Sequence, residues 1–307
     1  YNLNKNFGKW DENKKKDIVM SEVKDNEKLD YFWKSFLDFL ELKEKDADGY
    51  KNYFNIQQIE KNLHDQIGVE LPLDLVYMYQ DYMASSSVLR YANLFRQTTQ
   101  RIPNLLDIGS RFETALYFSH VANVTYLEPR EATLPLDDGS GGRKTLKHIP
   151  AFGILKGEGQ DIPADDESYE LVVSLHALEH FGLGRYGDTI DYYGDQKALK
   201  EYYRVLKKNG KLLLSIPCGF ENVIRFNKER IYHPSVIDEM VNDAGFNLEK
   251  GIVICPHRVS NPEISDKRDW NGVYFDHSLL DWFKETYEKD NSYVFPNAAY
   301  FVIASKK

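Results

Sequence analysis

The sequence is poor in the features that define several special classes of protein. It has only 2 cysteines in 307 residues, Cys218 and Cys255, which is too few for a disulfide framework. Free thiols favour a reducing compartment, so we expect a cytoplasmic protein. No signal peptide and no uninterrupted apolar run long enough for a transmembrane helix is visible, so we expect no membrane span.

Positive charge is also scarce. The chain has 39 Lys and Arg against 48 Asp and Glu, a net charge of −9 and a pI near 5.5. Nucleic-acid surfaces need clustered cations, so we predict no nucleic-acid partner. The hydrophobic content of 42% still allows a sizeable core. The chain begins with Tyr1 and lacks an initial methionine, so we expect a processed product or a piece of a longer polypeptide.

The first third of the chain predicts helices. Apolar residues recur at helical spacing within 29–42, and further helices are expected over 53–66 and 73–97. We therefore predict a helical N-terminal extension or cap over residues 1–98, followed by a second domain over 99–307. The aromatic residues of the extension are expected to pack rather than to line a substrate site. These aromatic residues include Tyr77, Tyr79, Tyr82 and Phe95.

From residue 103 onward, predicted strands alternate with helices, which indicates βαβ units and a mostly parallel sheet. The clearest helix runs from Asp195, its expected cap, to Lys208. The turn-rich segment Asp137–Lys144 is an insertion where we expect a flap. The predicted strands are 103–108, 123–128, 152–156, 169–175, 211–216, 247–254 and 298–304.

The first strand ends in a turn suited to a close ligand contact. In Asp107-Ile-Gly109-Ser110, a glycine lets the backbone approach a ligand, and the following helix offers free amides. The turn lacks the glycine pattern of dinucleotide-binding proteins, because Arg111 and Glu113 occupy the later positions. A pyrophosphate is therefore not predicted.

Two carboxylates follow the next strands. Glu128 ends a strand about 20 residues after the glycine turn, where a carboxylate accepts hydrogen bonds from ribose hydroxyls. The alternative is an ordinary exposed glutamate at a strand end. Glu158 lies in an acidic turn, where its carboxylate would accept from an adenine amino group while the amide of Gly159 donates to the ring. Together they predict a nucleoside at the carboxyl edge of the sheet.

These motifs resemble those of class I S-adenosylmethionine-dependent methyltransferases, over about 104–218 and the last strand. The resemblance implies an α/β, Rossmann-like class I methyltransferase fold, with a mostly parallel seven-stranded sheet, helices on both faces and S-adenosyl-L-methionine as cofactor. Two of the three glycines usual in the first turn are absent. The cofactor residues it implies are Asp107, Gly109 and Ser110 around the methionine portion, Glu128 on ribose, Glu158 and Gly159 on adenine, and Ser174 at the end of the fourth strand.

The segment His176-Ala-Leu-Glu179-His180 follows that strand. A neutral imidazole at the sheet edge suits a general base, and we predict this role for His180. The same spacing matches an inverted zinc-protease motif, so a zinc hydrolase using His176, Glu179 and His180 is an alternative. The glycines that follow disfavour the long helix that such a motif needs, and we expect no metal. A purely structural histidine is the third possibility.

The loop Gly182–Asp188 contains three glycines together with Arg185, Tyr186 and Asp188. We predict that these three residues hold the acceptor, with Arg185 on a phosphate or carboxylate and Asp188 on sugar hydroxyls. Alternatively, Arg185 and Asp188 pair with each other to fix the loop. The segment from His180 to Asp188 resembles a poorly characterised methyltransferase branch associated with bacterial cell-surface polysaccharide biosynthesis. That resemblance implies O-methylation of a sugar in a glycan or nucleotide-sugar; a non-catalytic ligand-binding domain on the same fold is the other alternative.

Overall fold

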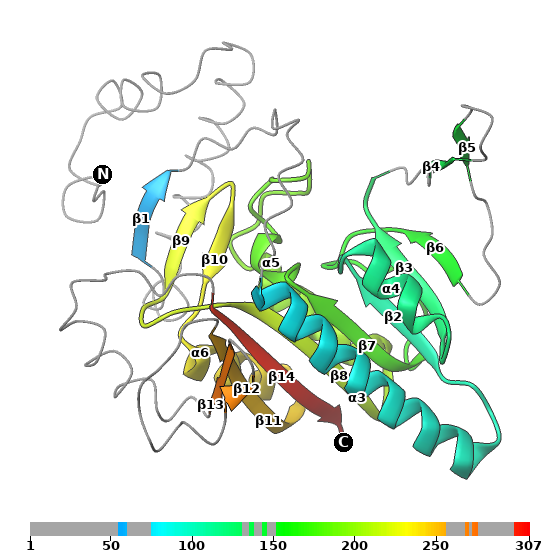
Figure 1. The fold of residues 1–307 in the computed structure, drawn as a ribbon. Helices are drawn as coiled ribbons and strands as arrows, with labels where there is room; N and C mark the ends of the chain where they lie inside the picture. The colour runs from blue at the N-terminus through cyan, green and yellow to red at the C-terminus, as the bar shows by residue number, and fades with distance from the viewer. Residues whose placement is uncertain are drawn as a thin grey trace.

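A nine-stranded sheet forms the centre of the molecule (Figure 1). The computed structural model describes residues 55–59, 75–130, 135–137, 143–145, 152–255, 268–269, 272–275 and 298–307. The strand order is β12-β13-β11-β14-β8-β7-β2-β3-β6. The strands are β2 (Asn104–Ile108), β3 (Asn123–Glu128), β6 (Phe152–Lys156), β7 (Tyr169–Leu175), β8 (Leu206–Cys218), β11 (Phe246–Cys255), β12 (Arg268–Asp269), β13 (Gly272–Phe275) and β14 (Ala298–Lys306).

The order of the strands determines where a ligand would bind. Strands β6, β3, β2, β7 and β8 are parallel, and β14 is antiparallel between β8 and β11. The chain moves outward from β2 through β3 to β6, and then crosses back to β7 on the other side of β2. Ligands of open α/β sheets bind at the carboxyl edge beside such a reversal. All seven predicted strands are present, which confirms the predicted Rossmann-like, class I methyltransferase fold, and the short strands β12 and β13 extend the predicted seven-stranded sheet to nine.

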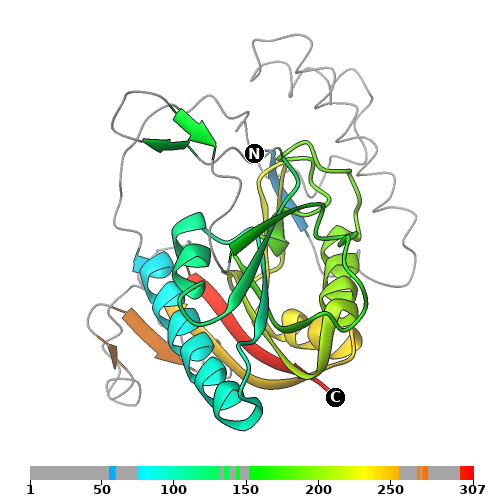
Figure 2. The ribbon, with the colours of Figure 1, turned by 90° about the vertical axis from the view of Figure 1, so that its right-hand side faces the viewer.

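Alternating apolar residues of the strands bury both faces of the sheet. Leu105 and Leu171 face one core, whereas their neighbours Leu106 and Val172 face the other. The first core includes α3 and α4, and the second includes α5 and α6, so that the sheet lies between two helical layers (Figure 2). The helices are α3 (Leu75–Thr99), α4 (Phe112–Phe118), α5 (Gly194–Val205) and α6 (Pro234–Asp243).

Helix α3 confirms the helix predicted over 73–97 and packs directly on the sheet. Val76, Ala84 and Val88 are buried in the same core as the strands. The division into residues 1–98 and 99–307 stays a prediction, but α3 shares its core with the second of these regions. None of the described helices is long and apolar enough to cross a membrane. The helix predicted over 29–42 lies outside the described residues.

The helix predicted over 53–66 is wrong at residues 55–59, which form strand β1 (Asn55–Ile59). This strand pairs in parallel with β9 (Val223–Phe226), which forms a hairpin with β10 (Glu229–Ile231). Tertiary pairing overrides the local helical pattern here. The small sheet β1-β9-β10 lies beyond one end of the main sheet (Figure 1).

Two further details differ from the sequence prediction. The flap expected over Asp137–Lys144 includes part of an antiparallel pair, β4 (Pro135–Asp137) with β5 (Arg143–Thr145). Helix α5 has its predicted buried face, but Asp195 does not cap it, because Tyr193 occupies the cap position. Asp195 is fully buried and accepts a hydrogen bond from the Tyr232 hydroxyl at 2.7 Å.

Candidate functional site at the carboxyl edge of the sheet

The turn after β2 is held tightly against the end of β7. Gly109 has a φ of 71°, and a β-carbon there would lie 2.9 Å from that of Ala177. The Ser110 amide donates to Asp107 Oδ1 at 3.1 Å, and Ser110 Oγ accepts from the Leu175 amide at 3.3 Å. A side chain at position 109 would therefore separate the two turns.

The carboxyl group of Asp107, in this turn, has a strongly raised pKa. It is fully buried, and its Oδ2 has no hydrogen-bond partner among the described residues. Burial raises the pKa of the Asp107 carboxyl from 3.8 to about 7; hydrogen bonds from Ser110 oppose this rise, and the charge of Asp81 adds to it. A buried acceptor without a donor costs free energy, which a donor-bearing ligand would recover.

Glu128 lies at the end of β3, as predicted, but its carboxylate already has a partner. Arg130 donates to it through Nε at 2.6 Å, through Nη2 at 3.0 Å and through its amide at 3.2 Å. Oε1 accepts two of these bonds and Oε2 accepts one, so a ribose would use the remaining acceptor site of Oε2 or displace Arg130. Residues 131–134, directly after this pair, lie outside the described part of the chain.

Glu158 and Gly159 lie in the turn that follows β6, the neighbour of β3. Glu158 is half-buried, and its backbone carbonyl accepts from the amide of Asp161 across the turn at 3.2 Å. Gly159 is buried against the ring of Phe181, which a β-carbon would approach to 2.4 Å. The structure thus brings Asp107, Glu128 and Glu158 to the ends of three adjacent strands. Their predicted contacts with a cofactor stay predictions.

Ser174 is the predicted cofactor residue that does not face this edge. It is fully buried within β7, and its hydroxyl lies 3.2 Å from the hydroxyl of Tyr202 on α5. The Ser174 side chain therefore links β7 to α5 by a hydrogen bond. We do not assign that side chain to a ligand.

The two histidines after β7 converge on one carboxylate. Glu179 Oε1 lies 3.3 Å from His176 Nδ1 and 3.6 Å from His180 Nε2. Burial raises the pKa of Glu179, but the two histidines outweigh it and the net direction is downward. The segment forms only a three-residue 3₁₀ helix, η4 (Leu178–His180), and His176 has a φ of 53°. The long α-helix of a zinc protease motif is absent here, and no metal-binding group was found among the described residues, so the hydrolase alternative is not favoured.

The two imidazoles differ in what their second nitrogens contact. His180 Nδ1 lies 2.5 Å from the carbonyl oxygen of Lys228, to which it donates, and burial lowers the pKa of His180. His176 Nε2 is buried and has no partner among the described residues, and neither has Glu179 Oε2. The ring of Tyr77 on α3 covers His176 at 4.7 Å between centroids. His176 was missed as a base candidate, although a glutamate three residues later is a signal for an oriented imidazole.

The loop Gly182–Asp188 is organised by Asp188 itself. This carboxylate accepts from the amides of Gly182 at 3.0 Å, Gly184 at 3.3 Å and Tyr186 at 3.1 Å. Its predicted role on sugar hydroxyls is not supported, because backbone amides occupy both oxygens. The alternative, a pair between Arg185 and Asp188, is not formed either, since Arg185 Nη1 donates to the Lys228 carbonyl at 3.0 Å.

Tyr186 lies within reach of cations on two sides. The guanidinium of Arg130 is 5.2 Å from the centre of its ring, and that of Arg185 is 5.4 Å from it. The imidazole of His180 meets the ring edge-on at 5.6 Å. The tyrosine is 37% exposed, so this cationic and aromatic group is accessible from outside.

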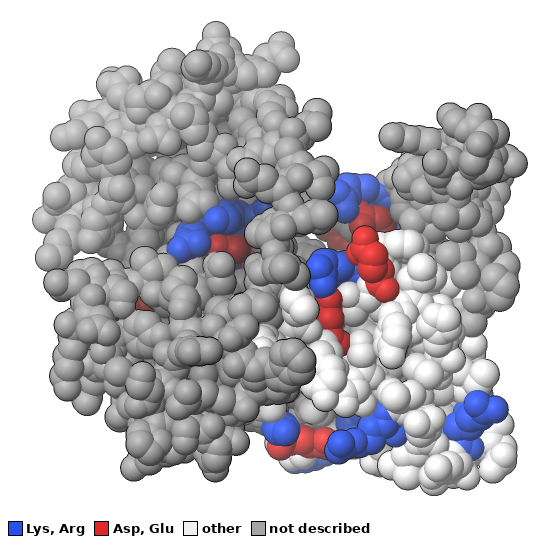
Figure 3. Space-filling view, in the orientation of Figure 1, with Lys and Arg blue, Asp and Glu red and all other residues white. Residues whose placement is uncertain are grey.

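Helix α3 brings polar side chains that the sequence analysis did not consider. Asp81 Oδ2 contacts Arg111 and accepts from the Thr114 hydroxyl at 3.1 Å. Gln80 is 1% exposed, and Gln80 Oε1 and Asp81 Oδ1 have no partner among the described residues. Basic and acidic side chains accordingly lie next to one another where α3 and α4 meet (Figure 3). The polar Gln80 between Val76 and Ala84 on a buried helix face is a signal visible in the sequence.

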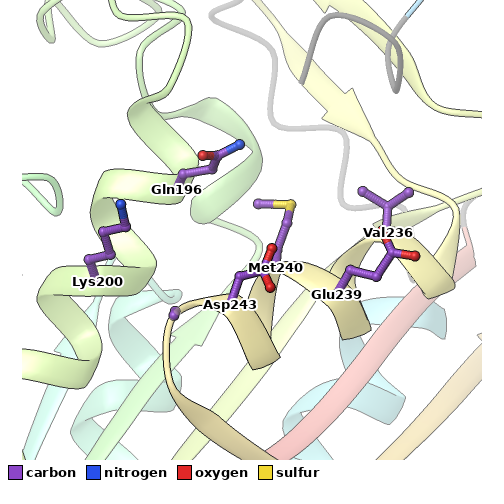
Figure 4. Close-up of a pocket in the computed structure, with 7 residues that line it drawn as sticks. Gln196, Lys200, Val236, Glu239, Met240 and Asp243 are labelled. Carbon is purple, nitrogen blue, oxygen red and sulfur yellow. The ribbon is translucent and has the colours of Figure 1, made fainter. Parts of the chain in front are cut away.

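A separate cavity lies between α5 and α6 (Figure 4). Its volume of about 70 Å³ is far below the usual range for ligand pockets. No predicted site residue lines it. Its lining comprises Gln196, Lys200, Val236, Glu239, Met240, Asp243 and Ala244.

Two sequence comparisons each match part of the chain. A family model described as "Caenorhabditis protein of unknown function, DUF268" matches residues 160–249. An uncharacterized methyltransferase of Schizosaccharomyces pombe is 37% identical over 68 residues, which are 22% of each chain. The chain thus spans about a fifth of that relative's length.

The chain is also similar to solved structures of methyltransferases. A SAM-dependent methyltransferase from Archaeoglobus fulgidus is 16% identical, with a TM-score of 0.43 over 74% of this chain and 94% of that one. The 1,6-didemethyltoxoflavin-N1-methyltransferase of Burkholderia thailandensis, solved with 1,6-didemethyltoxoflavin and S-adenosylhomocysteine, is 13% identical. Its TM-score is 0.40 over 76% of this chain and 84% of that one. These are similarities, so an activity for this chain is a proposal.

Proposed function

We propose that this protein is an S-adenosylmethionine-dependent methyltransferase with its cofactor at the carboxyl edge of β2, β3 and β6. The observation that supports this most directly is the buried Asp107 Oδ2 beside the strand-order reversal. It has no partner among the residues that the structure describes, and a ligand donor would satisfy it. Asp107, Gly109 and Ser110 would surround the methionine portion. Glu128 would accept from the ribose, and Glu158 with Gly159 would contact adenine.

The residues present fit such a group, with one departure. The closed turn at Gly109 and the orphaned acceptor at Asp107 suit a ligand with donors, whereas Glu128 is held by Arg130. When bound, S-adenosylmethionine supplies an electrophilic methyl group on a sulfonium. The protein's own part is to align an acceptor, exclude water and remove a proton.

For the acceptor we propose a sugar hydroxyl of a glycan or nucleotide-sugar, as the resemblance implies. Arg185 and the exposed Tyr186 would contact it, while Asp188 keeps their loop in shape. His180 is the base predicted from the sequence. His176 competes for this role, because its Nδ1 faces Glu179 and its Nε2 has no partner within the described ranges.

Titration calorimetry with S-adenosylhomocysteine tests the cofactor assignment. Wild-type protein should bind, and Glu128→Ala should weaken binding by about 1.5–3 kcal/mol, because charge-assisted hydrogen bonds to the ribose are lost. Arg130→Ala is the matched control, since it frees Glu128 and should leave affinity unchanged or raise it. Absence of binding to the wild-type protein would overturn the proposal.

The base is tested once a panel of sugar nucleotides and glycan fragments yields an acceptor. Loss of the true base should lower the turnover rate by roughly 10²–10⁴ and leave cofactor affinity nearly intact. His176→Ala and His180→Ala should differ, because only one nitrogen of the pair can take the proton. Wild-type rates in both variants would exclude general-base catalysis by either histidine.

A further inference from the structure

Arg130 contacts both halves of the candidate site. Its Nε and Nη2 donate to Glu128, the residue proposed for the ribose, at 2.6 and 3.0 Å. Its guanidinium carbon also lies 5.2 Å from the ring centre of Tyr186, a residue proposed for the acceptor. Arg130 follows β3 and the loop of Tyr186 follows β7, and β2 lies between these two strands in the sheet. The side chain of Arg130 therefore bridges the ends of the strands on either side of β2.

Arg185 reaches the same tyrosine from its own loop. Its guanidinium carbon lies 5.4 Å from the ring centre of Tyr186, and its Nη1 donates to the Lys228 carbonyl. Its Nε is buried and has no hydrogen-bond partner among the described residues, where Arg185 also forms no ion pair with a carboxylate. A half-buried cation with an unused donor and no counter-ion indicates a missing negatively charged partner.

Tyr186 can be reached by a ligand beside these two cations. Its side chain is 37% exposed. Burial raises the pKa of Tyr186, and the positive charges of Arg185 and Arg130 oppose this rise. The hydroxyl therefore stays protonated at neutral pH and can donate a hydrogen bond. An anion beside the ring would meet this hydroxyl and two guanidinium groups.

Arg130 is held by Glu128 but can leave it at small cost. The Arg130 side chain is 62% exposed, whereas that of Glu128 is only 10% exposed. Ion pairs with an exposed member contribute little to stability, because water replaces the lost contacts. A ribose hydroxyl on Glu128 Oε2 would compete with the bond from Arg130 Nη2, so cofactor binding would loosen the arginine.

We propose that Arg130, Arg185 and Tyr186 form a binding site for a negatively charged group of the acceptor, and that Arg130 joins this site when a ribose occupies Glu128. The acceptor is then an anionic sugar, with the diphosphate of a nucleotide-sugar or the carboxylate of an acidic glycan, and not a neutral glycan. Guanidinium groups bind both kinds of anion through two parallel hydrogen bonds. The site rests on the proposed function and narrows its substrate class.

The shared arginine couples the two ligands. When Arg130 moves from Glu128 to the acceptor anion, the ribose no longer competes with it, and each ligand strengthens the binding of the other. This coupling is reciprocal, so both affinities must change by the same factor.

Two simple anions test the site without knowledge of the complete acceptor. Inorganic pyrophosphate represents the diphosphate, and glucuronate represents the carboxylate of an acidic sugar. Calorimetry on the wild-type protein at constant ionic strength should show one of them bound roughly 5- to 10-fold more tightly with saturating S-adenosylhomocysteine than without it. The same anion should raise the affinity for S-adenosylhomocysteine by the same factor. The anion that responds identifies the charged group of the acceptor.

The two arginines should differ in their effects. In Arg130→Ala the coupling should disappear, and the affinity for S-adenosylhomocysteine without anion should approach that of the wild type with saturating anion. Arg130→Lys keeps the charge without the planar fork and should reduce the coupling. Arg185→Ala should weaken the anion by roughly tenfold or more and leave S-adenosylhomocysteine unaffected. Arg96→Ala removes an exposed guanidinium from the last turn of α3 and should change neither affinity.

The possible results separate this site from the cofactor assignment. Thermal melting shows that each variant is folded, and Arg130→Lys replaces Arg130→Ala if the latter does not fold. If neither anion binds the wild-type protein beside S-adenosylhomocysteine, or if the affinity is the same without it, the site is wrong while cofactor binding stands. Undiminished coupling in the Arg130 variants would also overturn it. If S-adenosylhomocysteine does not bind the wild-type protein, the proposed function falls and the site with it.

Discussion

The two sides of the candidate site treat buried polar groups differently. Around the loop Gly182–Asp188, the chain supplies the partners: Asp188 accepts from three backbone amides, and Arg230 donates to two carbonyl oxygens. Between α3 and β2, Asp107 and Gln80 each leave a buried oxygen without a donor in the described part of the chain. Satisfied groups fix a fold, whereas unsatisfied ones cost stability until something binds. The contacts of Asp188 and Arg230 therefore form a scaffold that holds the proposed acceptor residues Arg185 and Tyr186, and the second side is the candidate cofactor-binding surface.

The largest effect is expected from Arg230, the most deeply buried cation on the scaffold side. Its Nε lies 3.6 Å from Asp195 Oδ2, and both side chains are fully buried. Arg230→Met should destabilise the protein by about 3–5 kcal/mol, because Asp195 is left buried without its counter-ion. Urea unfolding measures this. Arg230→Met combined with Asp195→Leu should recover part of the loss, and equal stability of Arg230→Met and wild type would contradict the comparison.

A smaller loss is expected from Asp188→Ala. Three loop amides lose their acceptor, and partial exposure of the loop lets water replace some of these bonds, so we expect about 2–3 kcal/mol. Asp188→Asn keeps one acceptor oxygen and should lose less. Affinity for S-adenosylhomocysteine should be unchanged in both. A selective loss of ligand binding without a loss of stability would move Asp188 to the binding side.

On the binding side, replacing a buried carboxylate should stabilise the ligand-free protein rather than destabilise it. The folded-state pKa of Asp107, about 7, lies above the usual 3.8. The stability that this shift provides is complete below the unfolded value and is lost as the pH rises through about 7. Asp107→Asn removes the titration and should make the ligand-free protein more stable than wild type by about 1–3 kcal/mol at pH 8, with little difference at pH 4. Urea unfolding across this pH range is the measurement, and a constant difference would contradict the shifted pKa.

The smallest effect is expected where a charged pair is exposed. Lys197 contacts Asp191 near the start of α5, but its side chain is 58% exposed. Lys197→Ala should change the free energy of unfolding by no more than about 0.5 kcal/mol. The difference between the stability losses at Arg230 and at Lys197 would then be due to burial, since both side chains have an acidic partner. A loss comparable to that of Arg230→Met would remove this distinction.

The sequence predicted most where short-range pattern and burial agree. Strands β3, β6 and β7 have the bounds expected from their apolar runs, and the placement of Asp107, Glu128 and Glu158 at neighbouring strand ends followed from the alternation with helices. The apolar face of α5 was also predicted, because period 3.6 is a local property.

What the sequence did not predict depends on contacts between distant segments. The arginine on Glu128 is two residues away, but its position over Tyr186 depends on the fold of a loop more than 50 residues later. The partners of Asp188 are backbone amides of its own loop, which turns back on itself at glycines with positive φ. The sequence does not show these bonds, so the Asp188 carboxylate was predicted to be available for a ligand. Gln80 and Asp81 were overlooked because α3 was predicted to belong to an extension, whereas it packs on the sheet beside the glycine turn.

The pairing of β1 with β9 has a consequence for how the chain acquires its shape. Asn55 pairs with Val223, so the two strands are separated by more than half the chain. Closing so long a loop is entropically costly and slow, and β1 has nothing to pair with in this sheet until β9 has been made. During synthesis the backbone groups of β1 therefore stay unpaired in this sheet until β9 has been made. In that interval β1 could add to the β9–β10 hairpin of another copy, which makes this segment the place to look for strand exchange between molecules.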